Sequence, residues 1–269
     1  MRANVFDTMA EPDDVPLRCP YSVGSDQTIG DRKAQEDSYL LSDLNVTDWQ
    51  RSGLIVSVAD GVGGLGNGQI ASSAAMRALI SATQALSSTP PSELPDEQRL
   101  LKFTARAHSE VLRIVRGGTK CACTFICAMI RDMNLSFVSL GDSHIYLCRA
   151  GGLLQLNRDH VLGPAEDERE ALNLPTTPNA RRKAITSYLG KEELRLIDRN
   201  ITPIRLQAGD TVLLMSDGVY GTLSDDEIIS CIHGSAQDCA HAIIQATLAA
   251  RVPGQDNATC VVVRCNETI

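Results

Sequence analysis

Residues 54–66 read LIVSVADGVGGLG, a run of Leu, Ile and Val that ends in an aspartate followed by glycines. A short apolar run bounded by a turn is typical of a buried β-strand. Asp-Gly supplies the turn geometry, and a single carboxylate at the end of a strand is most often only a turn former. The stretch predicts a strand over Leu54–Ala59 that brings Asp60 to one edge of a sheet.

The same pattern recurs along the chain. Apolar runs lead into the acidic turns Gly141-Asp142-Ser143 and Ser216-Asp217-Gly218, while Gln35-Glu36-Asp37 and Gly254-Gln255-Asp256-Asn257 each precede one. Several carboxylates at one sheet edge would repel each other and take up protons unless a cation neutralised them. Because oxygen ligands favour hard cations, the pattern predicts a Mg²⁺ or Mn²⁺ site rather than a zinc site.

Two such ions would hold a bridging water, lower its pKa and direct it at an electrophile. A phosphoryl group suits this chemistry, because its oxygens need positive neighbours while the ester breaks. Arg32, five residues before Asp37, carries a planar guanidinium that could hold a phosphate. Taken alone, Arg32 is better explained as an ordinary surface charge.

The rest of the pattern predicts the elements around these turns. Apolar residues at three- and four-residue spacings indicate helices at Gln69–Leu86, Asp96–Val115 and Ala236–Ala250, and Ser224 with Glu227 forms a capping box. Hairpin turns are expected at residues 132–134 and 150–152. The remaining expected strands are Tyr39–Leu41, Phe125–Ile130, Leu135–Leu140, Ile145–Arg149, Thr211–Met215 and Thr259–Arg264.

Strands gathered around helices, without regular alternation of the two, indicate an α+β fold built on antiparallel sheet. Residues 1–20 contain three prolines and few apolar positions, so we expect an irregular N-terminal arm. Residues 21–269 are expected to form one domain. Within it, residues 161–198 are polar and contain further prolines, which predicts a flap over the sheet.

Composition excludes several classes of protein. The chain has 25 Lys and Arg against 33 Asp and Glu, a net charge of −8, and no basic stripe, which argues against a nucleic-acid binder. The N-terminus has no apolar signal segment, and no apolar run approaches the roughly 18 residues of a membrane helix. The cysteine count is nine, an odd number, which argues against a framework of disulfides. Together these features predict reduced thiols, a cytoplasmic protein and no membrane partner.

The motifs together resemble the metal-dependent protein phosphatases of type 2C, in the branch of bacterial Ser/Thr phosphatases. The resemblance spans Gly30 to Val263, and five motifs carry it in the family's order. They are Arg32-Lys33-Ala34-Gln35-Glu36-Asp37, Asp60-Gly61-Val62-Gly63-Gly64, Gly141-Asp142-Ser143, Ser216-Asp217-Gly218 and Asp256-Asn257. The implied fold is a sandwich of two antiparallel β-sheets flanked by pairs of α-helices, with the flap as an insertion.

The resemblance also implies a role for each site residue. Asp60 would bridge two Mn²⁺ or Mg²⁺ ions, and the Gly61 carbonyl would contact one of them. Asp37 would complete the shell of one ion, directly or through water, with Glu36 close by. Asp217 and Asp256 would hold the other ion, Arg32 would bind the phosphate, and Asn257 would orient its neighbours.

Two departures from the family pattern bear on these roles. Val62 stands where some members carry a histidine proposed as general acid, so the leaving-group proton is expected to come from water. Gly221 stands where an aspartate is frequent, so a third ion attributed to Asp142 and Asp217 is left open. The implied activity is one-step hydrolysis of phosphoserine and phosphothreonine in proteins, as the counterpart of a Ser/Thr kinase in signalling or secretion control.

Parts of the sequence are also compatible with two other functions. Gly61, Gly63 and Gly66 fit the G-x-G-x-x-G fingerprint of a dinucleotide-binding oxidoreductase, which also requires a parallel strand ending in an acid about 20 residues further on. The second alternative is a degenerate phosphatase domain that binds phosphoproteins without hydrolysing them. Such a domain would have lost metal ligands, whereas all four principal aspartates are present here.

Overall fold

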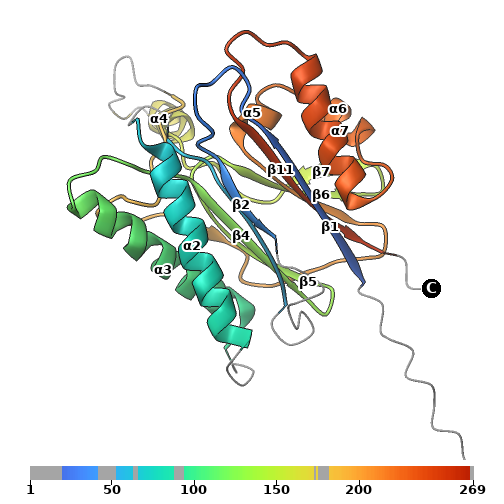
Figure 1. Cartoon of the computed structure of the whole chain (residues 1–269), viewed down its shortest axis with the longest axis horizontal. Helices are drawn as coiled ribbons and strands as arrows, with labels where there is room; N and C mark the ends of the chain where they lie inside the picture. The colour runs from blue at the N-terminus through green and yellow to red at the C-terminus, as the bar shows by residue number, and fades with distance from the viewer. Residues whose placement is uncertain are drawn as a thin grey trace, which may run out of the picture.

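The computed structural model describes residues 20–41, 53–62, 66–87, 94–172, 174 and 182–266. Helices α2 and α3 form one group, and α5, α6 and α7 another, with strands between them (Figure 1). In chain order the elements are β1 (Tyr21–Thr28), β2 (Ser38–Leu41), β3 (Leu54–Ala59), α2 (Gly68–Ser87), α3 (Asp96–Arg116), β4 (Phe125–Arg131), β5 (Asn134–Leu140), β6 (His144–Arg149), β7 (Gly152–Gln155), α4 (Leu162–Ala171), β8 (Asp198–Arg199), β9 (Ile204–Arg205), β10 (Thr211–Met215), α5 (Asp217–Tyr220), α6 (Asp225–Ser230), α7 (Ala236–Ala249) and β11 (Ala258–Cys265).

The described strands form two sheets. The first has the order β1-β11-β10-β6-β7, and the second has the order β2-β3-β4-β5-β8, with β9 also pairing with β5. Every pairing between these strands is antiparallel. The fold is therefore the predicted α+β sandwich of two antiparallel sheets, and the dinucleotide-binding alternative is wrong, because β3 pairs antiparallel with both β2 and β4.

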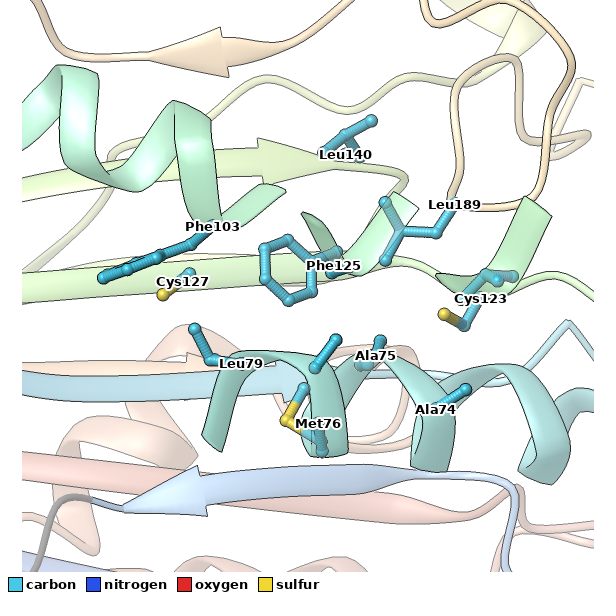
Figure 2. Packing of buried hydrophobic residues seen from close by; sticks show 14 of the residues in the cluster. Ala74, Ala75, Met76, Leu79, Phe103, Cys123, Phe125, Cys127, Leu140 and Leu189 are labelled. Carbon is cyan, nitrogen blue, oxygen red and sulfur yellow. The ribbon is translucent and has the colours of Figure 1, made fainter. Parts of the chain in front are cut away.

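Three apolar layers hold the sheets and helices together. The first lies between α2, α3 and the β2–β5 sheet, the second between the two sheets, and the third between the other sheet and α5 to α7. Figure 2 shows the first layer, in which Leu79 of α2 and Phe103 of α3 lie over Phe125 and Cys127 of β4. Strands buried on both faces explain why their sequences are continuous apolar runs.

Most of the predicted elements are confirmed to within a residue or two at their ends. Both hairpins are present, and their two-residue turns place Asp132, Met133, Ala150 and Gly151 at positive φ. That geometry matches the right-handed twist of the flanking strands. The capping box at Ser224 also forms, with its hydroxyl accepting from the Glu227 amide.

Several elements were not predicted. Strand β1 has the sequence YSVGSDQT, whose two apolar residues are too few to predict a strand, and it forms because it pairs along its whole length with β11. Helix α4 lies inside the predicted flap, over residues 162–171. The predicted arm up to residue 19, Gly63 and Gly64, and residues 175–181 of the flap lie outside the described residues. Among the described helices, none is long and apolar enough to cross a membrane.

Candidate active site

The sandwich brings the acidic turns to one edge. Ser38 pairs with Ala59, so Asp37 and Asp60, the next residue outward on each strand, lie side by side at the end of the β2–β3 pair. In the other sheet, Met215 pairs with Cys260, which places the Asp217 and Asp256 turns at the adjoining end of β10 and β11. The loop with Asp142 crosses from β5 to β6 at the same edge.

Asp37 joins the two sheets. Its Oδ2 accepts hydrogen bonds from Ser216 Oγ and Thr259 Oγ1, each at 2.7 Å; Ser216 directly follows β10 and Thr259 lies in β11, both strands of the opposite sheet. Its Oδ1 is buried and has no hydrogen-bond partner among the described residues. Burial is the main cause that raises the pKa of Asp37 to about 6, and the negative charge of Asp217 adds to it.

Asp60 lies at the centre of the acidic group. Its side chain is partly exposed, but the surrounding protein removes enough water to raise its pKa well above the usual value. The negative charges of Asp37, Asp217, Asp142 and Asp256 raise that pKa further. The backbone of Asp60 is fixed by Thr124, whose Oγ1 accepts from the Asp60 amide at 2.9 Å and whose amide donates to the Asp60 carbonyl at 2.8 Å.

The same surroundings raise the pKa values of Asp142 and Asp217. Burial raises the pKa of Asp142 to about 6, with a further contribution from Asp217. Burial also raises the pKa of Asp217, followed by the charge of Asp256, while the positive charges of Lys183 and Arg32 act in the opposite direction. Each of these carboxylates therefore lacks a full counter-charge from the protein.

Arg32 and Asp256 form an ion pair at the rim of the site. The guanidinium Nη2 lies 2.5 Å from Asp256 Oδ2, and the two side chains remain 50% and 38% exposed. An exposed pair of this kind contributes little stability. The structure thus brings the predicted phosphate-binding residue next to a predicted metal ligand.

Glu36 and Asn257 support the backbone of the acidic turns. The Glu36 carboxylate accepts from the Gly68 amide at the first turn of α2, where a helix favours negative charge, and its carbonyl accepts from Gly61. Asn257 accepts from the Glu36 amide and donates to the carbonyls of Ile29 and Ala34. Asn257 therefore ties the β11 turn to the loop that carries Arg32, Glu36 and Asp37.

A buried histidine, His144, lies beside the acidic group, and no sequence motif predicts it. His144 stacks on Tyr220 with 3.6 Å between the ring centres, and its Nδ1 lies 2.7 Å from the Tyr146 hydroxyl. Its Nε2 lies 2.9 Å from Asp159. Tyr220 donates to the Asp142 carbonyl at 2.7 Å, so this cluster supports the Asp142 turn from behind.

Sequence reasoning also missed the hydroxyl and amide groups that hold the carboxylates in place. These residues are Ser216, Thr259, Thr124 and Gln255. Their only sequence signal is position, because each lies within a few residues of an aspartate or of a strand end. Serine and threonine are too common in such turns for that position to distinguish them.

The donor set fits a hard cation. All the converging side chains offer oxygen, and the buried Asp37 Oδ1 lacks a partner in the described structure. As they stand, however, the described residues contain no group of three or more Asp, Glu, His and Cys side chains arranged to hold a metal ion. Two of the carboxylates are engaged by hydroxyls or by Arg32, so holding an ion requires side chains to reorient.

Comparison with known proteins adds a family match. The family model for protein phosphatase 2C matches residues 29–252, which is most of the chain. The Ser/Thr phosphatase Stp of Listeria innocua is 28% identical over 225 residues, covering 79% of this chain and 84% of that protein. The Ser/Thr protein phosphatase PstP of Mycobacterium tuberculosis is 28% identical over 237 residues, covering 85% of this chain and 44% of PstP.

Solved structures show the same fold. The crystal structure of the catalytic domain of PstP in complex with two manganese ions superposes with a TM-score of 0.69 at 24% identity. The match covers 92% of this chain and 99% of that structure. The Ser/Thr phosphatase of S. agalactiae superposes with a TM-score of 0.73 at 22% identity, covering 91% of this chain and 100% of that structure.

Proposed function

Since this chain belongs to the protein phosphatase 2C family, we propose that it hydrolyses phosphoserine and phosphothreonine in proteins with the help of two bound Mn²⁺ or Mg²⁺ ions. The proposal depends on five aspartates that lie at one edge of the sandwich: Asp37, Asp60, Asp142, Asp217 and Asp256. Each of them lies close enough for its negative charge to raise the pKa of another aspartate or to have its own pKa raised. Uncompensated carboxylates cost stability, and a site that keeps them gains from a cation.

The ions, when bound, supply Lewis acidity and lower the pKa of a water that attacks phosphorus. Asp60 would be a ligand of both ions. Asp37 and the Gly61 carbonyl would hold one of them, and Asp217 and Asp256 would hold the other. Glu36 and Asn257 hold these ligands in place through backbone hydrogen bonds. Asp142 is the candidate ligand for any third ion.

Arg32 is proposed to bind the phosphate of the substrate. In the structure it is bound to Asp256, and a cation on Asp256 would release the guanidinium for the phosphate. Release of this exposed pair costs little, since such pairs contribute about 0–1 kcal/mol. Val62 offers no proton, so water is proposed to protonate the leaving serine or threonine.

We extend the proposal to partners and location. The substrates would be proteins phosphorylated by a Ser/Thr kinase, which fits the names of its Listeria and Mycobacterium relatives as Ser/Thr phosphatases, and the protein would act in a bacterial signalling pathway. A cytoplasmic location is supported by the cysteines, because all eight in the described part of the chain are buried free thiols.

The test is release of p-nitrophenol from its phosphate ester and of phosphate from a phosphothreonine peptide, with Mn²⁺ titrated into chelator-treated protein. We expect no turnover in EDTA, recovery with Mn²⁺ or Mg²⁺, and loss of that recovery in Asp217→Ala. Activity that persists in chelator would contradict the proposed chemistry. No turnover at any metal concentration, in protein shown to be folded, would favour the degenerate phosphoprotein-binding domain.

A further inference from the structure

Gln255 makes an unusual set of contacts for a loop residue next to the site. Its side chain is buried, with 7% exposure, although it lies in the turn before β11. Its Nε2 donates to the Gly218 carbonyl at 2.9 Å and to the Asp256 carbonyl at 3.3 Å. Its Oε1 accepts from Thr222 Oγ1 at 3.0 Å. All the polar atoms of the amide are thus used.

These contacts connect the two segments that carry neighbouring carboxylates. Gly218 directly follows Asp217 at the start of α5, and Asp256 is itself the other carboxylate. One amide group therefore bonds to both backbones, and this fixes the distance between them. The two aspartates repel each other, and a hydrogen bond between the segments opposes their separation.

Neighbouring groups also hold the backbone of Gln255 in place. The Asp31 carboxylate accepts from the amides of Gly254 and Gln255, and the Asp31 amide donates to the Gln255 carbonyl at 2.9 Å. The Thr222 hydroxyl lies 2.8 Å from the Gly218 carbonyl and 3.0 Å from Gln255 Oε1, and it shares its single proton between these two acceptors. The side chain has little freedom to adopt another arrangement.

We propose that Gln255 is a positioning residue that sets the spacing of Asp217 and Asp256 for a divalent cation by hydrogen bonding to both backbones. The proposal rests on the proposed function, because it assigns these two aspartates to one ion. In this role Gln255 would act through the two aspartates and would not itself be a metal ligand. Groups that orient metal ligands typically change metal affinity by about 10–100-fold when removed.

The test is calorimetric titration of Mn²⁺ into metal-free protein, comparing wild type with Gln255→Met and Gln255→Glu. Methionine keeps the volume without the hydrogen bonds, and glutamate keeps the shape but replaces the donor with a negatively charged oxygen. We expect both to weaken binding of one Mn²⁺ about tenfold. Thr222→Val, which removes a single contact to the amide, is expected to weaken it about fivefold.

Gln237→Met is the matched control. Gln237 also uses both ends of its amide, accepting from the Ser25 amide and donating to the Ser25 carbonyl, but it joins α7 to β1. The Gln237→Met variant should bind Mn²⁺ as wild type does, with a melting temperature similar to that of Gln255→Met. Equal losses of Mn²⁺ affinity in the Gln255 and Gln237 variants would overturn the positioning role but not the proposed function. Unchanged Mn²⁺ binding in Gln255→Met and Thr222→Val would do the same. Absence of Mn²⁺ binding in wild type would overturn the proposed function with it.

Discussion

Asp60 shows how one residue can lower stability while serving the proposed chemistry. Four other carboxylates act on it, and of these only Asp256 has an ion-pair partner in the described structure, which is Arg32. Its raised pKa means that the folded protein favours the protonated acid. The destabilisation is therefore absent below the ordinary pKa of an aspartate and grows as pH rises above it.

Asp60→Asn is expected to stabilise the metal-free protein near pH 7.5 by about 1–3 kcal/mol, and by less near pH 5, because asparagine resembles the protonated acid. The same change is expected to reduce Mn²⁺-dependent turnover by orders of magnitude. Thermal unfolding in EDTA at both pH values, followed by the p-nitrophenol assay, measures both effects. A lower melting temperature for the variant near pH 7.5 would show that Asp60 is not electrostatically strained.

At the scale of elements, the site depends on how closely α5 approaches β11. Gly218 lies in α5, and a Cβ on it would lie 2.1 Å from the Asn257 carbonyl oxygen and 2.8 Å from the carbonyl carbon. Both are backbone atoms, which cannot move aside as a flexible side chain can. Only glycine allows the Asp217 and Asp256 turns to come this close.

Gly218→Ala is expected to lower the free energy of unfolding by about 1–3 kcal/mol or more, since overpacking forces the backbone apart. It should also weaken Mn²⁺ binding, because α5 carries Asp217. Gly152→Ala is the control, as it lies at an exposed site of β7 where the nearest atom to a new Cβ is 3.6 Å away. Urea denaturation of the two variants compares them, and equal stability would refute the close approach.

For the whole molecule, the acidic edge links stability to pH and metal. The pKa values of Asp37 and Asp142 rise from 3.8 to about 6. Folded protein keeps protons that the unfolded chain releases, so these groups make the metal-free fold less stable as pH rises from about 4 through about 6. His108 and His160, whose pKa values are lowered mainly by burial, act in the opposite direction as pH falls below about 6.5.

Mn²⁺ is expected to raise the melting temperature more near pH 7.5 than near pH 5, because protons compete with the ion for the same carboxylates. Each kcal/mol of binding energy corresponds to roughly 2–4 °C for a protein of this size. Melting curves with and without saturating Mn²⁺ at the two pH values provide the measurement, and Asp60→Asn serves as the control with a reduced shift. An equal rise at both pH values would mean that the ion binds elsewhere.

Local sequence determined the elements and most of the acidic residues of the site. Apolar runs such as Leu54–Ala59, short and bounded by turn residues, indicate a buried strand whichever partner covers them. Turn residues and the capping box at Ser224 act through neighbours in the chain. The order of the five motifs then carried the resemblance to the family, and with it the expected sandwich.

The tertiary structure alone decided what joins these residues. Strand β1 exists because β11 provides hydrogen-bond partners, which its own sequence does not reveal. The bonds from Ser216 and Thr259 to Asp37, and from Gln255 to Gly218, connect positions far apart in the chain. Such contacts depend on distances fixed by sheet pairing and packing, so no local pattern records them. Sequence supplied the carboxylates, and the fold decided their spacing and supports.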